Sequence, residues 1–275
     1  NSGSDRMADF GSTSYIDIPM NNDLYTIDSA ITVSYWAFGD PAKQPMNGTC
    51  LEAYDTLNNR VINTHMPWGD SNVYWDAGNS GGSSYDRINK AATTTEIENQ
   101  WNYWTFTKNV ATGSMKIYLN GVLWHSGTAL TRTISKIKKF RLGKGQWGGS
   151  ESYEGNMDEF AVFNTELDQP TIQAYMNKYI DALHPNYSNL VAYYHFDDGN
   201  FSTAADVAPG SHPSAVYMSA GNPLKKASEL VYNFTESVNR PNIVFEQGAF
   251  TTYIDSTLVE DSTMNSPISI LVFGD

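Results

Sequence analysis

The sequence has little of several features that would narrow its class at once. Its 275 residues include one cysteine, Cys50, which excludes an internal disulfide, so the core alone must hold the fold. Basic residues are also scarce, because 17 Lys and Arg stand against 30 Asp and Glu, a formal net charge of -13. Such a charge repels phosphate backbones and anionic lipid, so we expect no nucleic-acid partner.

Long hydrophobic runs are absent as well. No apolar run approaches the roughly 18 residues of a membrane-spanning helix, so we expect no membrane insertion. What is abundant instead is Thr, Ser, Asn, Gly and aromatic residues, the last making up 13% of the chain. This composition favours strands and turns, and the length fits one large β domain with an appendage.

Alternation of side chains predicts several strands. In ITVSYWAF at 31–38 the odd-numbered residues share one face and the even-numbered residues the other, and YWTFTK at 103–108 and FRLG at 140–143 alternate likewise. In MKIYLNGVLWH at 115–125 two apolar runs flank Asn120-Gly121, the pair best suited to a type I′ hairpin turn.

The second half of the chain contains one short stretch that predicts a helix, and its composition changes after that. In LDQPTIQAYMNKYI, Asp168 is a candidate N-cap and Pro170 lies in the first turn. From about residue 225 the chain consists of short β-like runs with little Trp or Gly. We expect a sandwich over 1–224, with 190–224 completing it, and over 225–275 a small β-rich extension or a linker to a missing domain.

The string GNMDEFAVFNTEL at 155–167 places two adjacent carboxylates in a predicted strand. Alternation sends Asp158 to the face of Phe160, and Glu159 to the opposite face with Met157 and Ala161. Glycoside hydrolysis needs two carboxylates that face the same sugar, and the E-x-D-x-x-E string that places them so does not occur. The sequence therefore favours a noncatalytic protein.

Asp158 is also a candidate ligand for calcium. It follows Gly155-Asn156 at the mouth of the strand, where loop carbonyl oxygens could join its carboxylate, and hard oxygen ligands suit Ca²⁺. The alternative, equally open, is that Asp158 accepts hydrogen bonds from loop N–H groups.

Six strings in order carry a resemblance to a known family. They are DFGSTSYIDIP (9–19), ITVSYWAF, WNYWTFTKN (101–109), MKIYLNGVL, FRLGKG (140–145) and GNMDEFAVFNTEL. Over about residues 8–180 the chain resembles the laminin-G-like branch of the concanavalin-A-like lectin/glucanase superfamily. One departure is that the usual opening strand is absent from the N-terminus, and a similar string, LVAYYHFDDG, stands at 190–199 instead.

The resemblance implies an all-β fold, a two-sheet antiparallel jelly-roll sandwich with one short helix and the small C-terminal extension. Such domains commonly bind carbohydrate or protein in bacterial surface or secreted proteins, often beside a catalytic domain. In the family, the Asp of the G-x-[IM]-D-E string frequently binds a structural calcium. That position is Asp158, and Asp9 in the opening string is the second candidate ligand.

One stretch, HMPWGDSNVYWDAGNSGGSSYDRINK at 65–90, gathers aromatic and polar residues suited to a glycan. Trp68, after a proline, is a natural platform, and only one of Tyr74 and Trp75 can join it because neighbours in a strand diverge. The alternative is that one of those two is ordinary core and the Gly-Ser run a loop. The candidate ligand-binding residues are Trp68, Asp70, Tyr74, Trp75, Asp76, Asn79, Tyr85, Arg87 and, in a second loop, Trp147.

Other charged or titratable residues are assigned no ligand. His65, His125 and His195 share no metal-ligand spacing and are expected to be isolated strand or surface residues. Arg87, which lies near two carboxylates in the sequence, is also expected to form a structural ion pair.

The sequence thus predicts a noncatalytic, lectin-like module of a secreted, periplasmic or bacterial cell-surface protein, with a glycan or glycoprotein as partner and calcium as the one candidate cofactor. Two alternatives stay open. The chain could be part of a glycan-processing enzyme, a glycoside hydrolase or a peptide-N-glycosidase-like protein with an attached catalytic domain. It could also be a protein-binding or spacer module.

Overall fold

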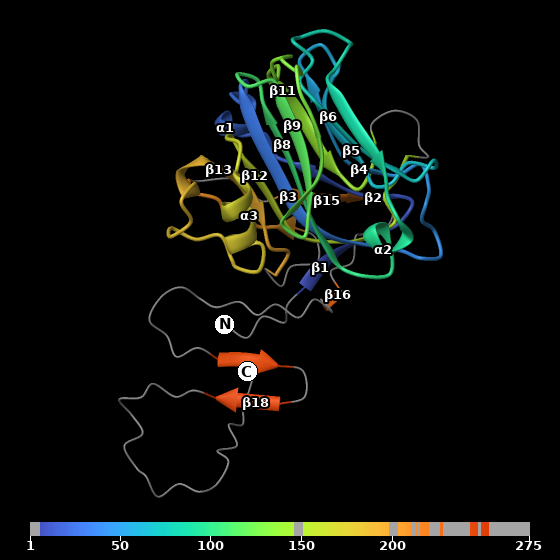
Figure 1. Ribbon diagram of the computed structural model, residues 1–275, viewed down its shortest axis with the longest axis vertical. Coiled ribbons are helices and arrows are strands. Elements are labelled where there is room, and N and C mark those ends of the chain that lie inside the picture. The colour runs from blue at the N-terminus through green and yellow to red at the C-terminus, as the bar shows by residue number, and fades with distance from the viewer. Residues whose placement is uncertain are drawn as a thin grey trace, which may run out of the picture.

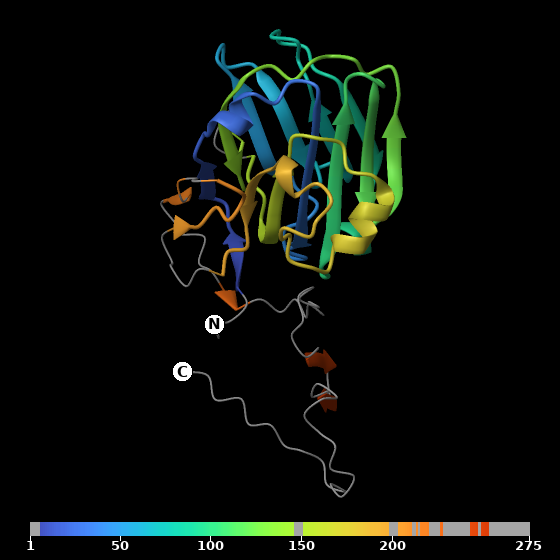
Figure 2. The ribbon, with the colours of Figure 1, turned by 90° about the vertical axis from the view of Figure 1, so that its left-hand side faces the viewer.

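Two antiparallel sheets stack face to face as a sandwich (Figures 1 and 2). The computed structural model describes residues 6–145, 151–197, 203–210 and 213, and the backbone of the strand segments 215–219, 226–227, 243–246 and 249–252. The predicted all-β fold, a sandwich of two antiparallel sheets, is confirmed.

The first sheet has β3 and β12 at its centre, and its strands pair in the order β10-β9-β8-β3-β12-β1-β16. β13 also pairs with β12, beyond the end of β1. The bounds are β10 (Val122–Gly127), β9 (Ser114–Leu119), β8 (Asn102–Asn109), β3 (Ala30–Gly39), β12 (Gly155–Phe163), β1 (Arg6–Phe10), β16 (Lys226–Ala227) and β13 (Leu190–Tyr194).

The second sheet pairs in the order β14-β15-β2-β11-β4-β5-β6-β7. Its bounds are β14 (Thr203–Ala204), β15 (Ala215–Ser219), β2 (Ser14–Ile18), β11 (Ile137–Leu142), β4 (Thr49–Asp55), β5 (Arg60–His65), β6 (Asn72–Ala77) and β7 (Arg87–Ala91). A separate hairpin consists of β17 (Ile243–Glu246) and β18 (Ala249–Thr252). Strands β13, β14 and β15 therefore add one strand to the first sheet and two to the second.

Helix is confined to short segments, namely α1 (Asn22–Tyr25), α2 (Thr94–Ile97), α3 (Gln169–Tyr175) and a 3₁₀ turn, η1 (Tyr187–Asn189). α3 is the predicted helix, and it begins where the sequence indicated, because the Asp168 carboxylate accepts the N–H of Thr171. The four-residue helices α1 and α2 were not predicted, since each is a single capped turn without a periodic apolar face.

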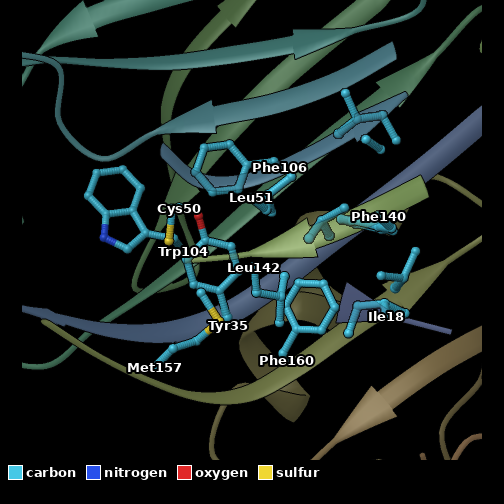
Figure 3. Close-up of a cluster of buried hydrophobic side chains, with 14 of the residues drawn as sticks. Ile18, Tyr35, Cys50, Leu51, Trp104, Phe106, Phe140, Leu142, Met157 and Phe160 are labelled. Carbon is cyan, nitrogen blue, oxygen red and sulfur yellow. The ribbon is translucent and has the colours of Figure 1, made fainter. Parts of the chain in front are cut away.

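The core lies between the two sheets. The predicted faces of β3 are confirmed, because its odd-numbered residues lie in the core and Trp36 packs on the outer side. Figure 3 shows Tyr35 of β3 beside Phe106 of β8 and Phe160 of β12, with ring centroids 5.8 and 6.2 Å from that of Tyr35. Burial of this cluster stabilises the fold without a disulfide. Cys50 is a fully buried free thiol within it.

The outer faces of the two sheets differ. On the first sheet a second apolar cluster, which includes Tyr103, Phe163 and Tyr193, packs beneath Ile172 of α3. On the second sheet the outer face of β4 to β7 carries charged side chains, among them Arg87 with a side-chain exposure of 35%. The second sheet therefore offers the open face on which a ligand could lie.

No described helix has both the length and the apolar composition needed to cross a lipid bilayer.

Candidate functional site

The turn between β5 and β6 positions Trp68 at the edge of the second sheet. The N–H of Trp68 donates to the carbonyl of Asn72 at 2.9 Å, and the N–H of Ser71 donates to the carbonyl of Trp68 at 2.8 Å. Gly69 donates its N–H to the side-chain oxygen of Asn47 at 3.1 Å, which ties the turn to the loop before β4. These bonds hold a half-buried indole beside the sheet face.

Strand register decides which side chains of β5, β6 and β7 share that face. His65 pairs with Tyr74, and Asp76 pairs with Arg87, and directly opposed residues lie on the same side of a sheet. Trp75, between Tyr74 and Asp76, points into the core, where its indole N–H donates to the carbonyl of Thr107 at 2.9 Å. Polar and aromatic side chains thus alternate with the core residues along each strand.

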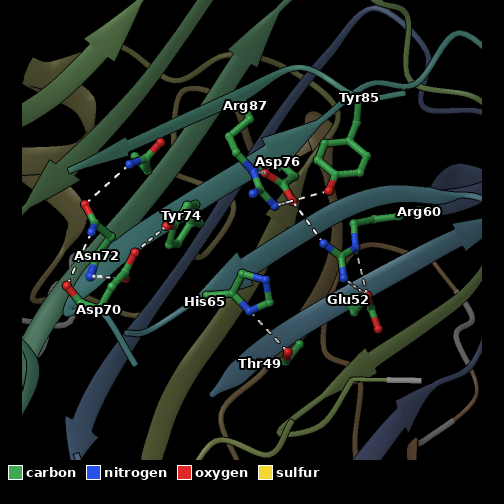
Figure 4. A network of polar contacts seen from close by, with 11 residues as sticks. Thr49, Glu52, Arg60, His65, Asp70, Asn72, Tyr74, Asp76, Tyr85 and Arg87 are labelled. Carbon is green, nitrogen blue, oxygen red and sulfur yellow. Dashed lines mark hydrogen bonds and ion pairs between the residues drawn. The ribbon is translucent and has the colours of Figure 1, made fainter. Parts of the chain in front are cut away.

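A pocket of about 250 Å³ opens on this outer face, bounded by two guanidinium groups, three rings and one carboxylate. Figure 4 shows four of the residues that line it, from strands β5, β6 and β7. Its lining residues are Arg60, His65, Trp68, Tyr74, Arg87 and Glu151. A volume of this size accepts a monosaccharide and leaves the rest of a longer chain at the surface.

The two arginines are fixed by carboxylates beneath them. Arg60 contacts Glu52 at 2.8 Å and Asp76 at 3.3 Å, and Arg87 contacts the same Asp76 at 2.5 and 2.7 Å through two nitrogens. The side chains of Glu52 and Asp76 are fully buried, while those of the arginines are 18% and 35% exposed. Arg60 and Arg87 therefore present the remaining N–H groups of an anchored network to the pocket.

Aromatic rings flank this network. The Trp68 ring lies 4.4 Å from that of His65, and the Arg87 guanidinium stacks 4.7 Å above the ring of Tyr74. The Tyr74 hydroxyl donates to the Asp70 carboxylate at 2.7 Å, which fixes the ring. The Tyr85 hydroxyl accepts a hydrogen bond from Arg87 at 3.3 Å. The rings offer apolar planes next to hydrogen-bonding groups, the combination that sugars require.

The titratable groups of the pocket are shifted by burial and by their neighbours. Burial, with the positive charges of Arg60 and Arg87, lowers the pKa of His65 to about 3, so its imidazole is neutral at physiological pH. Burial raises the pKa of Asp76, and its hydrogen bonds and ion pairs with Arg87 and Arg60 oppose the rise. Burial, then repulsion from Glu52, raises the pKa of Glu151.

The structure brings together six of the predicted ligand-binding residues and separates the others from them. Those at or next to the pocket are Trp68, Asp70, Tyr74, Asp76, Tyr85 and Arg87. Trp75 and Asn79 are fully buried and cannot meet a ligand there, since Trp75 is core and Asn79 bonds Asp55 and Ser135. Trp147 lies outside the described residues.

Three lining residues were missed. His65 was expected to be isolated, yet it packs between Trp68 and Tyr74. Arg60 and Glu151 were not predicted at all. For His65 a signal existed, because it precedes Trp68 by three residues and ends a strand that leads into the turn. Glu151 is more than 60 residues from every other lining residue in the sequence, and only the fold brings it there.

The acidic pair of β12 does not alternate as predicted. Met157 and Phe160 both lie in the inner core, because a β-bulge lies between Asp158 and Ala161, and Glu159 adopts a φ of 50°. The prediction that Met157 shares the face of Glu159 is therefore wrong. So is the placement of Asp158 on the face of Phe160, since its register partner is Trp36 on the outer side.

Both carboxylates of the pair are buried and hydrogen-bonded. The Asp158 carboxylate accepts the N–H of Glu159 at 2.9 Å, and Glu159 contacts Nδ1 of His195 at 2.9 Å and the hydroxyl of Tyr193. His195, expected to be isolated, is thus paired. Because the two acidic residues are 0% and 7% exposed, neither faces solvent where a polysaccharide could lie.

No group of three or more His, Cys, Asp or Glu side chains in the described part of the chain is arranged to hold a metal ion. Asp9 accepts a bond from the side-chain amide of Asn156 at 2.8 Å, and Asp158 caps its bulge. Calcium at Asp9 and Asp158 stays a prediction, which melting with and without a chelator tests.

With the fold and pocket described, the chain can be compared with known proteins. A laminin-G model of the concanavalin A-like lectin/glucanases superfamily matches residues 10–173, more than half of the chain. The chain therefore belongs to this superfamily, as the six strings predicted. No curated protein sequence matches it.

Two solved structures share the fold. A candidate carbohydrate-binding protein from Bacteroides ovatus is 16% identical over 83% of this chain and 61% of its own, with a TM-score of 0.59. A heptameric SAP-like pentraxin from Limulus polyphemus is 13% identical over 78% of this chain and 97% of its own, with a TM-score of 0.50. This chain thus spans about three fifths of the Bacteroides protein. At these identities the likeness shows the fold alone.

Proposed function

We propose that this chain is a noncatalytic carbohydrate-binding module of a secreted or cell-surface protein, and that the pocket over β4 to β7 is its glycan site. The observation that carries the proposal is the pocket itself, in which Trp68 and Tyr74 lie beside anchored guanidinium groups. Carbohydrate binding is also suggested for the Bacteroides ovatus protein of the same fold. The partner is a glycan or a glycoprotein.

The pocket suits a sugar because each part of the ligand has a matching group. The C–H face of a pyranose packs on an aromatic plane, which the indole of Trp68 offers at the pocket edge. Equatorial hydroxyls at the ring margin need both donors and acceptors. The guanidinium groups of Arg60 and Arg87, already held in place by buried carboxylates, donate, and the carboxylate of Glu151 accepts.

The carboxylates of the pocket favour binding over cleavage. Hydrolysis by the two-carboxylate mechanism needs an acid and a second carboxylate on either side of the scissile bond. Of the six lining residues, Glu151 alone is a carboxylate, and Glu52 and Asp76 lie fully buried under the arginines. An attached catalytic domain in the parent protein is compatible with this role, as is a second role in protein binding.

A glycan array tests the proposal. We expect Trp68→Ala to weaken binding of any captured glycan by at least about tenfold, because the apolar platform is lost. Trp101→Ala is the matched control, since Trp101 is also partly exposed but packs on Phe38 away from the lining residues. If Trp68→Ala binds as the unsubstituted protein does, the pocket is not the glycan site. Release of reducing ends from labelled oligosaccharides would instead support the enzyme.

A further inference from the structure

The outer face of the second sheet carries a row of alternating charges. Register partners run across it from β2 to β7, and the row reads Asp17, Arg141, Glu52, Asn63, Asp76 and Arg87. Each arginine of the row contacts a carboxylate, including Arg141, whose Nε lies 2.6 Å from Asp17. The row therefore has no cation whose charge is left without a partner.

The pocket that lies over this row is not electropositive, although two arginines line it. Arg60 and Arg87 stand against four carboxylates in and around the pocket, which are Glu52, Asp70, Asp76 and Glu151. Burial raises the pKa of Glu151, and the charge of Glu52 adds to the rise while that of Arg60 opposes it, so Glu52 is near enough to repel a second negative charge in the pocket. The chain's net charge of -13 adds to that potential at long range.

The uncharged groups of the pocket supply an acceptor as well. Nδ1 of His65 lies 3.2 Å from the carbonyl oxygen of Gly48, which can only accept, so the neutral ring carries its proton on Nδ1. Nε2, the ring nitrogen turned away from Thr49 in Figure 4, is then an acceptor. A hydroxyl can donate to this nitrogen, whereas a carboxylate cannot.

An unsatisfied amide lies in the floor of the same face. Asn63 stands between Glu52 and Asp76 in the row and is fully buried, and within the described residues neither its amide nitrogen nor its amide oxygen has a hydrogen-bond partner. Asn63 therefore adds an uncharged polar group to the row between the two carboxylates.

From these observations we infer that the pocket selects neutral saccharides over acidic ones, an inference that rests on the proposed function. The arginines donate to hydroxyls through N–H groups that Glu52 and Asp76 do not occupy, while Glu151 and His65 accept. A sugar carboxylate or sulfate would enter a site whose cations are already paired with carboxylates and would be repelled by Glu151. Two arginines in a pocket thus serve here as hydroxyl donors and not as anion receptors.

The test is a titration with matched oligosaccharides. Glucose-, galactose- and mannose-based oligosaccharides are each compared with the counterpart oxidised at C6 to the uronic acid, at low and at high salt. For the oligosaccharide that the protein binds, we expect the neutral form to bind at least about tenfold more tightly than its uronic-acid counterpart at low salt. High salt should narrow the gap by screening the repulsion of the acidic member.

A charge substitution then assigns the effect to the pocket. Glu151→Gln removes the one lining carboxylate, so the acidic member should gain affinity by about fivefold or more while the protein keeps its melting temperature. Asp28→Asn, which removes an exposed charge elsewhere, is the control and should change neither member.

The outcomes separate the two proposals. Equal or tighter binding of the acidic member, lost in Trp68→Ala, would overturn the selectivity and leave the glycan site standing. An acidic member unaffected by Glu151→Gln would also overturn it. If neither member of any pair binds, the proposed function itself fails.

Discussion

Neighbouring residues in a strand point to opposite faces of the sheet, and this decides which aromatic side chain can contact a ligand. The sequence predicted that only one of Tyr74 and Trp75 could join Trp68, and the structure selects Tyr74, because Trp75 packs in the core. Alternation sufficed for this. It did not reveal Arg60, which bridges Glu52 on one neighbouring strand and Asp76 on the other, since strand order is needed to bring the three together.

The buried neutral histidines make an acid-sensitive fold. The pKa of His65 falls to about 3 and that of His184 to about 4 in the native state, both mainly by burial, against 6.5 as the ordinary value. Below pH 6.5 the unfolded chain therefore binds more protons than the native one. Stability falls as the pH decreases from about 6.5, by at most about 1.4 kcal/mol per pH unit for each histidine.

His65→Gln should reduce this slope, because the substitution removes one group that must stay uncharged. Chemical denaturation at intervals between pH 4.5 and 7 measures it, and His184, together with His125 and the shifted carboxyl groups, sets the slope that remains. His125→Gln is the comparison, since burial and then Lys90 lower the pKa of His125 as well, but its side chain is only partly buried, so its substitution should reduce the slope less than His65→Gln does. Equal slopes for the His65→Gln variant and the unsubstituted protein would show that His65 is not held neutral by the fold.

At the scale of elements, the bulge in β12 is the clearest departure from prediction. β1 pairs with β12 as far as Met157, and β13 pairs from Phe160 onward, so Asp158 and Glu159 lie where one neighbour ends and the other begins. An added residue at that junction reverses which face of the sheet the preceding side chains of β12 point to. The alternation of the sequence around Asp158 gives no sign of the bulge. The bulge lies where β12 changes its partner from β1 to β13, and these two strands are more than 170 residues apart along the chain.

The hairpin between β9 and β10 was predicted correctly, and it yields a stability prediction. Asn120 and Gly121 have φ angles of 50° and 74°, as a type I′ turn requires. Gly121→Ala should cost about 1 kcal/mol or more, because a Cβ at this φ is strained and would lie 2.8 Å from Cγ of Gln173 in α3.

Urea denaturation measures this cost. Gly11→Ala is the control, because a Cβ there would come no closer than 3.9 Å to Ser14 and its φ lies outside the left-handed region. A Gly121→Ala variant as stable as the Gly11→Ala variant would contradict the turn geometry.

At the scale of the molecule, the fold was predictable and the site was so only in part. Six strings in order identified the superfamily, because the strands and turns of a sandwich are visible in the sequence as alternating side chains and turn residues. The pocket depends on which outer face stays open. α3 and the apolar cluster beneath it cover the first sheet, whereas charges on the second sheet leave room for a ligand. That difference emerges only when both sheets are assembled.

The most direct test of the glycan site is a crystal structure of the chain with the neutral oligosaccharide that binds most tightly. We expect a sugar ring against the indole of Trp68, with its hydroxyls on Arg60, Arg87 and Glu151 of the pocket. A ring bound at another face, or held between two solvent-exposed carboxylates that flank its glycosidic bond, would contradict a binding site over β4 to β7.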